Sequence, residues 1–463
     1  MSLPFSTPDT TAPDTSTTHT STPDTDAADI APAPAAHLAG NFAPVDREIT
    51  VDRLPVTGSI PPDLDGWYLR NGPNPRAGSA HWFLGDGMLH GVRVRGGRAE
   101  WYRNRWVRTG QFDGDPTPLY DPATGERNLA VSHANTHIVA HAGRTLALVE
   151  SSLPWEVTRD LETLGAYDFG GALRDSMTAH PKICPTTGEL HFFGYGNLRA
   201  PHVTYHRADE TGRLVVEQPV DVPGLTMMHD FAITERYVLF LDLPVVFDLS
   251  LAMAGTMPYR WDSGYGARIG VMRRDDPSAP VRWFEIEPCY VFHVANAFDT
   301  PGASGAGEAD NDVITLVAVR YPTMWVSGPD SFDPDGTLHE WRIDLGAGTV
   351  VERALDDRRI EFPRIDDTHA GRRHDAVYAV GRHDLVRYDG AGPLARGFGA
   401  DEPGEPVFVP SADGRGYLIT YVYRAETATS DLVVLDASDL SQLASVHLGV
   451  RVPAGFHGNW FPA

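Results

Sequence analysis

Four histidines lie in sequence frames that set them apart from the rest of the chain. They are His180 in Ser-Met-Thr-Ala-His-Pro-Lys, His229 in Met-Met-His-Asp-Phe, His293 in Val-Phe-His-Val-Ala-Asn, and His457 in the final segment Gly-Phe-His-Gly-Asn-Trp-Phe-Pro-Ala. A chain end is normally free to fray, so an aromatic-rich end built around a histidine suggests that His457 is held inside the fold. Imidazole is a ligand for iron, zinc, copper and nickel, and four converging imidazoles would make a metal site.

Three glutamates stand within largely apolar segments, where an unpaired carboxylate would be costly. They are Glu150 in Leu-Val-Glu-Ser-Ser-Leu-Pro, Glu361 in Ile-Glu-Phe-Pro-Arg-Ile, and Glu405 in Gly-Glu-Pro-Val-Phe-Val. Four neutral imidazoles leave a divalent ion its full positive charge, and carboxylates behind such ligands orient the rings and offset that charge. These three acids are candidates for that supporting role.

The histidine count alone does not single out a site. The chain has 19 histidines, and several stand four residues apart, as in His133/His137, His137/His141 and His202/His206, a spacing that imitates a metal site. No other feature supports these pairs, and a buried histidine is more often an ordinary core residue than a ligand. We therefore interpret the pairs as structural.

Short strands account for most of the chain. Runs of β-branched and aromatic residues are separated by Gly, Pro, Asp or Asn, for example at 237–241, 313–319, 376–380, 416–423 and 432–436. Helical periodicity is confined to residues 155–164 and 246–254. Many short strands joined by turns predict an all-β sandwich, barrel or propeller.

The spacing of the residues that could do chemistry favours the propeller. Successive separations along the set are 30, 49, 64, 68, 44 and 52 residues for Glu150, His180, His229, His293, Glu361, Glu405 and His457. Each separation is close to the length of one four-stranded blade with its loops. Because the innermost strand of every blade faces the central channel, residues repeated about once per blade would converge on the axis.

Composition divides the chain into two parts. Residues 1–38 consist mostly of Thr, Pro, Asp, Ala and Ser, and they lack the apolar groups needed to offset the cost of ordering, so we expect a disordered tail. Residues 39–463 are expected to form a single domain, with a flexible surface loop at 300–311.

Charge and cysteine content limit the partners and the compartment. The net charge of −24 excludes nucleic acid as a natural partner and suits a neutral or apolar substrate. Lys182 is the only lysine, and its place beside His180 predicts a structural role. The two cysteines, Cys184 and Cys289, are too few for a disulfide framework, and the start of the chain lacks a secretory signal, so a cytoplasmic location is expected. No apolar run of about eighteen residues predicts a membrane-spanning helix.

Together with several longer motifs, the four histidine frames resemble those of the carotenoid cleavage oxygenases. The resemblance includes Ile60-Pro-Pro-Asp-Leu-Asp-Gly-Trp-Tyr-Leu-Arg-Asn-Gly-Pro-Asn-Pro75, His81-Trp-Phe-Leu-Gly-Asp-Gly-Met-Leu-His90 and Asn104-Arg-Trp-Val-Arg-Thr109. It covers essentially all of residues 40–463.

The resemblance implies a seven-bladed β-propeller, with loops and short helices capping an axis that carries one non-haem Fe(II). It implies that the ligands are His180, His229, His293 and His457, that Glu150, Glu361 and Glu405 hydrogen-bond three of these imidazoles, and that Thr136 lies beside an open coordination position. The reaction of the family is insertion of both atoms of O2 across a conjugated C=C bond, which gives two carbonyl products.

Two branches of that family differ in substrate. The branch that cleaves stilbenes and other phenylpropanoids grips a phenol with a lysine and a tyrosine, whereas this chain has Ser132 and His133 where that lysine is expected. The motifs of the N-terminal half also look more like the carotenoid branch. We therefore expect an apolar polyene, a carotenoid or apocarotenoid, with a stilbene as the alternative. Trp155, Phe231, Tyr321 and Trp325 are candidate tunnel residues, although an ordinary place in the core is the more common role of such side chains.

The sequence alone leaves some partners and functions undecided. The apolar segment 245–254 fits either peripheral contact with a membrane or a buried helix across the top of the propeller. No obligate protein partner is expected. A retinoid-ester isomerase of the same family is an alternative. So is a propeller of another class, either a metal-dependent hydrolase or a binding platform, because a fold alone does not decide function. A calcium-dependent hydrolase would need oxygen ligands rather than histidines.

Overall fold

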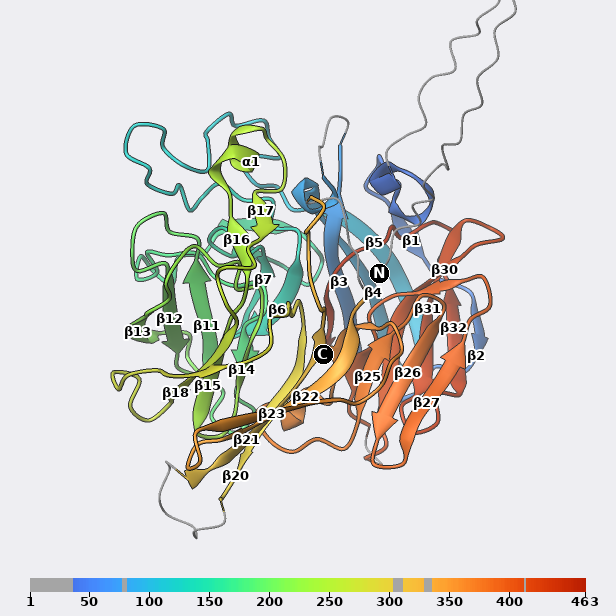
Figure 1. Ribbon diagram of the computed structural model, residues 1–463. Helices are drawn as coiled ribbons and strands as arrows, with labels where there is room; N and C mark the ends of the chain where they lie inside the picture. The colour runs from blue at the N-terminus through green and yellow to red at the C-terminus, as the bar shows by residue number, and fades with distance from the viewer. Residues whose placement is uncertain (1–35, 77–80, 303–310, 329–334, 412–413) are drawn as a thin grey trace, which may run out of the picture.

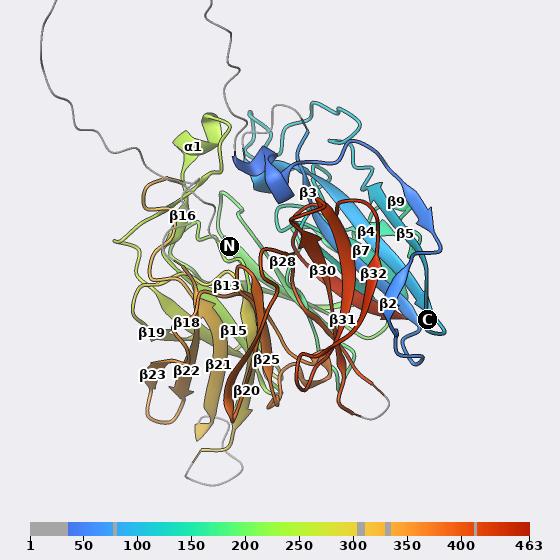
Figure 2. The ribbon, with the colours of Figure 1, turned by 90° about the vertical axis from the view of Figure 1, so that its right-hand side faces the viewer.

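The protein is an all-β propeller. The computed structural model describes residues 36–76, 81–302, 311–328, 335–411 and 414–463. Within these ranges the chain forms seven antiparallel sheets of four to six strands and one separate two-stranded hairpin. The sheets are arranged as blades (Figures 1 and 2). The prediction of a seven-bladed β-propeller is confirmed.

Five blades each contain four strands, which are hydrogen-bonded to one another in chain order. The first two are β6 (His137–His141), β7 (Arg144–Leu148), β8 (Trp155–Val157), β9 (Thr163–Ala166), and β10 (Lys182–Ile183), β11 (Leu190–Tyr195), β12 (Val203–Ala208), β13 (Leu214–Val220). The third is β14 (Phe231–Ile233), β15 (Tyr237–Asp242), β18 (Arg268–Arg273), β19 (Arg282–Glu285). The last two are β20 (Val294–Thr300), β21 (Val313–Arg320), β22 (Thr337–Asp344), β23 (Thr349–Ala354), and β24 (Glu361–Arg364), β25 (Val377–Val380), β26 (Asp384–Asp389), β27 (Gly392–Gly397).

The remaining two blades join the two ends of the chain. One contains β1 (Thr50–Asp52), β3 (Gly66–Asn74), β4 (Asp86–Arg95), β5 (Arg98–Trp106) and the C-terminal β33 (Gly458–Pro462). The other contains β2 (Val56–Gly58), β28 (Glu402–Pro403), β29 (Val407–Val409), β30 (Tyr417–Arg424), β31 (Thr429–Asp436) and β32 (Gln442–His447). The pairings of β3 with β33 and of β2 with β32 therefore close the ring twice. The C-terminal segment is held inside the fold, as its sequence frame suggested.

Burial along the strands shows where the core lies. All six residues of β15 are buried, whereas residues of the outer strand β13 alternate between partly buried and exposed. An outer strand faces solvent on one side, which produces this period of two. The core fills the space between neighbouring blades, where aromatic rings such as those of Phe193 and Phe231 pack 5.2 Å apart.

Helix is rarer than the sequence suggested. Residues 155–164, predicted as helical, form the hairpin of β8 and β9, so that prediction is wrong. The Oγ1 of Thr158 accepts a hydrogen bond from the backbone N–H of Glu162 (3.0 Å), and Leu161 has a φ of 72°. A residue with left-handed backbone angles interrupts a right-handed helix, so the chain forms a turn between β8 and β9 instead of a helix.

Residues 246–254 are helical only in part. The hairpin of β16 (Val245–Phe247) and β17 (Tyr259–Trp261) carries the five-residue α1 (Leu249–Met253) at its tip, capped by the side chain of Asp248. The other helical turns of the described residues are 3-10 segments: η1 (Ala36–Leu38), η2 (Gly40–Phe42), η3 (Trp82–Leu84) and η5 (Asp367–His369). No residue of α1 is buried, so the interpretation as a buried helix is wrong.

Residues 1–35 of the predicted tail (residues 1–38) lie outside the described residues. The same holds for residues 303–310 of the loop predicted at 300–311. Cys184 and Cys289 are buried and unpaired with each other. Among the helices of the described ranges, none is long and apolar enough to cross a bilayer.

Candidate metal centre

Each of the four framed histidines stands just before the strand at the inner edge of a blade. His180 precedes β10 and His229 precedes β14, each by two residues, while His293 and His457 directly precede β20 and β33. In a propeller these strands line the central channel. The fold therefore brings together four residues that span 277 positions of the sequence, from 180 to 457.

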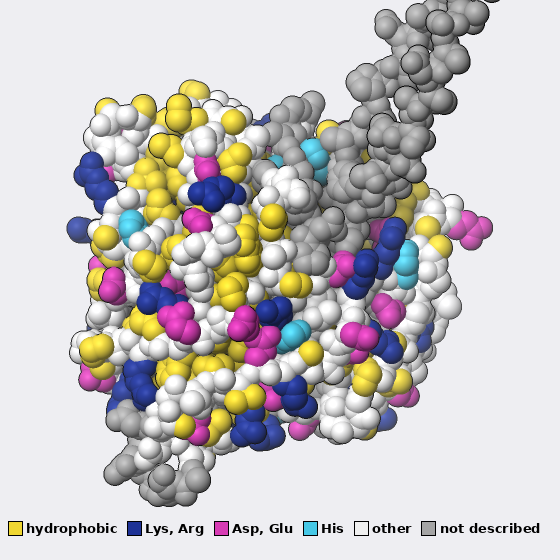
Figure 3. Space-filling view, viewed as in Figure 1, with side chains coloured by type: hydrophobic (Ala, Val, Ile, Leu, Met, Phe, Trp, Pro, Cys, Tyr) yellow, Lys and Arg dark blue, Asp and Glu magenta, His cyan; other side chains and the backbone are white. Residues whose placement is uncertain are grey.

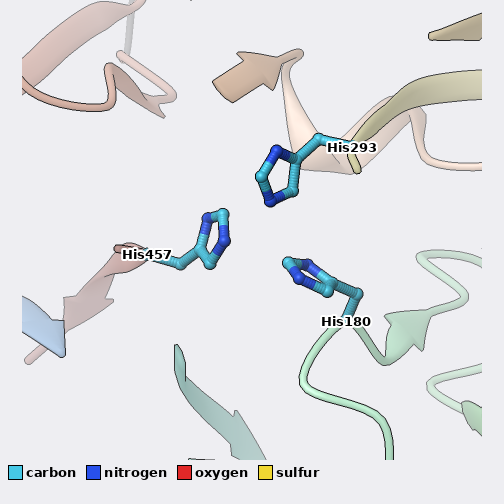
Figure 4. Close-up of side chains that lie close together, drawn as sticks. All are labelled: His180, His293 and His457. Carbon is cyan, nitrogen blue, oxygen red and sulfur yellow. The ribbon is translucent and has the colours of Figure 1, made fainter. Parts of the chain in front are cut away.

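The four imidazoles form one cluster. The ring of His180 lies 4.5 Å from that of His229, 5.1 Å from that of His293 and 4.6 Å from that of His457, measured between centroids. One nitrogen from each of His180, His293 and His457 lies within 4.8 Å of the other two (Figure 4). The Nε2 atoms of His180 and His229 are 3.0 Å apart.

The three predicted glutamates each contact one of these rings. The Nδ1 of His229 donates to Glu150 (2.7 Å), that of His293 to Glu361 (2.5 Å) and that of His457 to Glu405 (2.9 Å). Within the described residues, no carboxylate lies within hydrogen-bond distance of His180. A carboxylate that accepts from Nδ1 fixes the tautomer of a neutral imidazole, so in their neutral, metal-binding form His229, His293 and His457 present the lone pair on Nε2.

The carboxylates are themselves held in place. Glu361 also accepts from the hydroxyl of Tyr321 (2.7 Å) and from the backbone N–H of Phe362 (2.5 Å). Glu405 also accepts from the guanidinium of Arg364 (3.3 Å) and from the backbone N–H of Gly458 (2.8 Å). Both carboxylates are almost fully buried, and these contacts supply the partners that their charges require.

Burial and neighbouring charges set the protonation of the cluster. Desolvation, together with the other imidazoles, holds the pKa values of His180 and His457 well below the usual range. Burial also acts to lower the pKa of His229, but Glu150 more than offsets it and the pKa is raised. Burial acts to raise the pKa of Glu361, but His293 outweighs it and lowers that pKa to about 2. His180 and His457 are therefore neutral imidazoles, the form that binds metals.

The donor set fits a divalent transition metal. The Nε2 of His293 is buried and has no hydrogen-bond partner among the described residues. A buried nitrogen without a partner is costly, and lone pairs converging from neutral imidazoles repel one another unless a cation lies between them. A ligand set of imidazole nitrogens without thiolate or carboxylate suits iron, zinc, copper or nickel, and excludes calcium and magnesium, which prefer oxygen.

An apolar cavity of about 800 Å³ opens onto the cluster. His229, His293 and His457 form part of its wall, as do Thr136 and Glu150. The hydroxyl of Thr136 donates to Asn135 (2.9 Å). Much of the remaining wall is aromatic, from Trp82, Phe83, Tyr259, Phe292, Phe362 and Phe456. The cavity could hold a long apolar molecule against the histidines.

Of the four candidate tunnel residues, Tyr321 lines this cavity, and the other three pack in or against the core, the more common role of such side chains. Phe231 is fully buried between blades, and Trp155 packs in the core between the blade of β3 and the blade of β6. Trp325 lies behind the wall, with its ring 6.4 Å from that of Phe83 and 5.9 Å from that of Phe292. Aromatic residues fill both cores and cavities, and the sequence does not distinguish the two uses.

The sequence did not predict two features of the site. In the blade of β6 the residue directly before the first strand is Thr136, whereas Glu150 follows β7. His137, which was set aside as part of a spacing pair, has its ring 5.1 Å from that of His457. Its Nδ1 donates to the carbonyl of Ala179 (2.7 Å) and its Nε2 faces the amide of Asn459 (3.1 Å), so both nitrogens are occupied and the ring positions the segment before His180. Its place at the start of a strand, beside Thr136, was the available signal.

Lys182 has the structural role that its position suggested. Its ammonium forms an ion pair with the buried Asp230 (2.8 Å), whose other oxygen accepts from the backbone N–H of Val294 (2.8 Å). Three neighbouring blades are thereby tied together beside His180, His229 and His293.

Comparison with known proteins gives a consistent result. The family described as retinal pigment epithelial membrane protein matches residues 42–462. A carotenoid cleavage oxygenase of Mycobacterium tuberculosis is 38% identical, over 94% of this chain and 99% of its own length. A carotenoid 9,10(9',10')-cleavage dioxygenase of Crocus sativus is 32% identical, over 92% of this chain and 88% of its own.

Solved structures are also similar. A lignostilbene dioxygenase of Pseudomonas brassicacearum is 27% identical, with a TM-score of 0.80 over 92% of this chain and 98% of its own. A cobalt-substituted apocarotenoid oxygenase of Synechocystis is 27% identical, with a TM-score of 0.78 over 91% and 97% of the two chains.

Proposed function

The chain belongs to the carotenoid cleavage oxygenase family, and from this premise we propose that it is a non-haem Fe(II) dioxygenase that cleaves a conjugated C=C bond of a carotenoid or apocarotenoid. One observation carries the proposal: four clustered histidines, three of them hydrogen-bonded to glutamates, lie at a largely apolar cavity whose wall includes three of the four. The co-substrate is O2 and the products are two carbonyl compounds.

In this proposal His180, His229, His293 and His457 hold one Fe(II). When bound, the iron supplies the activation of O2, which needs an open coordination position. Thr136 lies on the cavity wall beside His457, whose backbone N–H donates to the Thr136 carbonyl (3.1 Å), and we assign Thr136 to the edge of that open position. Glu150, Glu361 and Glu405 keep the protons on Nδ1, so that each Nε2 stays available.

The rest of the cavity binds and orients the substrate. Phe292, Phe362 and Phe456 present apolar surface beside the histidines, so they exclude water and hold one double bond near the cluster. The proposed reaction needs no general acid or base from the protein. The side chains act by positioning, and an aromatic wall tolerates variation in the length of a polyene better than a polar site would.

A carotenoid or apocarotenoid is favoured over a stilbene. Ser132 and His133, at the position where a phenol-binding lysine is expected, both line the cavity. The only lysine, Lys182, is engaged with Asp230. The similarity to a lignostilbene dioxygenase keeps the stilbene as the second candidate.

The hairpin that carries α1 is a candidate membrane contact. Leu249 is 61% exposed and Met253 is 81% exposed, one turn apart on α1, and hydrophobic side chains gather on this part of the molecule (Figure 3). Phe247 and Tyr259, which pair across the hairpin next to the loop that carries α1, line the cavity. Contact of α1 with a bilayer would place the cavity near dissolved polyenes, which fits a cytoplasmic protein with peripheral membrane association.

The test is an aerobic incubation of the iron-loaded protein with carotenoids, apocarotenals and hydroxystilbenes, with products identified by mass. We expect two carbonyl fragments from a carotenoid or apocarotenal, and no products after iron is removed by a chelator. Cleavage of stilbenes alone would replace the substrate assignment, and turnover that does not depend on iron would overturn the proposed reaction.

A further inference from the structure

One arginine in the wall of the cavity lacks a partner for most of its charge. Arg127 lines the cavity, and its Nε and Nη1 atoms are buried without a hydrogen-bond partner in the described part of the chain. No carboxylate of the described residues lies within 4.0 Å of its guanidinium. Arg364, the arginine beside the histidine cluster, is by contrast paired with both Glu405 and Asp367. A buried guanidinium that cannot lose its proton requires an anion or several acceptors.

The guanidinium of Arg127 is fixed in place. Tyr120 and Arg127 face each other as a β-bridge. The Tyr120 hydroxyl accepts from Nη2 of Arg127 (3.2 Å) and donates to the carbonyl of Gly196 (3.0 Å). The guanidinium packs directly on Gly196, where a Cβ would collide with Nη2. The local structure therefore holds Nη2 and leaves Nε and Nη1 as unused donors.

The surroundings of Arg127 are also positive. Arg127 and Tyr120 border a second pocket of about 310 Å³, whose wall includes Arg174 and Arg199. Neither of these two forms an ion pair within the described residues, and Glu126 is the one acidic residue of the described wall. This is unusual on a chain whose net charge is −24. An anionic group that reached Arg127 would enter a region of positive potential.

We propose that Arg127 binds a carboxylate at one end of a conjugated substrate, so that the preferred substrates are polyene carboxylic acids of the apocarotenoid class. The inference rests on the proposed function and names the end group of its substrate. The apolar wall accommodates the polyene, and the guanidinium of Arg127, which no carboxylate of the described residues neutralises, donates a charge-assisted hydrogen bond to the carboxylate. An aldehyde accepts a hydrogen bond but does not neutralise the charge of the guanidinium. A hydrocarbon neither accepts a hydrogen bond nor neutralises that charge. The expected order of preference is acid, then aldehyde, then hydrocarbon.

The test compares kcat/KM for an apocarotenoic acid, the apocarotenal of the same chain length, and a carotene hydrocarbon. Arg127→Gln should lower kcat/KM for the acid by about tenfold to a hundredfold, mainly through KM, since a charge-assisted hydrogen bond is lost. It should change kcat/KM for the hydrocarbon less than about twofold. Arg127→Lys should restore part of the loss. Arg213→Gln, which removes a cation that is 78% exposed, is the matched control and should behave as wild type.

Three results would overturn the inference: wild-type preference for the hydrocarbon over the acid, an equal effect of Arg127→Gln on all three substrates, or preference for a stilbene carboxylate over the polyene acid. The first and third need no variant, so they hold even if Arg127→Gln fails to fold. Failure of the proposed function has a different signature, which is no cleavage of any conjugated compound by the iron-loaded protein. Quenching of tryptophan fluorescence by the polyene acid would then still report whether binding depends on Arg127.

Discussion

The two buried glutamates behind His293 and His457 should differ in how well glutamine replaces them. At Glu361, His293 and the Phe362 N–H share one carboxylate oxygen, while the hydroxyl of Tyr321 occupies the other. A glutamine can place its oxygen toward His293 and its NH2 toward Tyr321, whose hydroxyl can rotate to accept. Glu361→Gln therefore loses the charge but no hydrogen bond, and we expect iron binding to weaken by about tenfold, or about 1.4 kcal/mol.

At Glu405 both oxygens face donors that cannot rotate. One accepts from His457 and Arg364, and the other from the backbone N–H of Gly458. The NH2 of a glutamine must oppose one of these donors, and an unsatisfied buried donor costs about 1 to 3 kcal/mol beyond the lost charge. If the NH2 faces Nδ1 of His457, it also favours the tautomer that protonates Nε2. We expect Glu405→Gln to weaken iron binding by about a hundredfold or more.

The assay is the iron dissociation constant, measured by competition with a chelator under anaerobic conditions. Melting temperatures of the metal-free proteins would separate loss of the metal site from loss of the fold. Glu285→Gln, on the exposed outer strand β19, is the control and should match wild type. Equal iron affinities for the Glu361 and Glu405 variants, or the reverse order, would refute the hydrogen-bond reasoning.

Four further outcomes are expected. His457→Ala should retain the fold but lose most iron and most turnover, because three imidazoles hold the ion poorly; full iron content would refute the C-terminal ligand. A chain that begins at Ala36 should keep the melting temperature and turnover rate of the full chain, since residues 1–35 contain few apolar groups, and a large fall in either would contradict this. Leu249→Ser with Met253→Ser should weaken sedimentation with lipid vesicles without a lower melting temperature, whereas unchanged sedimentation would exclude α1 as the contact. An apocarotenal should be cleaved with a higher kcat/KM than resveratrol, and the opposite preference would remove the polyene assignment.

Much of the architecture could be predicted because the sequence repeats a simple unit. Short β-branched runs separated by turn residues indicated an all-β chain, and the spacing of the framed residues matched one blade. The position of each histidine just before the innermost strand of a blade explains why that spacing was informative. Glu150 broke the pattern, since it follows β7, and the residue of that blade in the corresponding position is Thr136.

The remaining features of the fold and the site depend on tertiary contacts that no local sequence pattern encodes. The segment 155–164 has helical periodicity, but pairing of β8 with β9 and a left-handed Leu161 override it. Trp155 and Phe231 could belong to either the tunnel or the core on their sequence, and the structure packs them between blades. The unused donors of Arg127 follow from what the fold leaves unpaired around its guanidinium, which the sequence alone does not reveal.

The most direct test of the metal assignment is X-ray absorption at the iron edge on the anaerobically loaded protein. We expect one iron per chain, surrounded by about four nitrogen ligands at roughly 2.0 to 2.2 Å, with the outer-shell scattering typical of imidazole. Replacement of any one of His180, His229, His293 or His457 should lower the iron content, and the iron that remains bound should have one nitrogen ligand fewer. A shell dominated by oxygen or sulfur, or a nitrogen shell unchanged in these variants, would contradict a four-histidine iron centre.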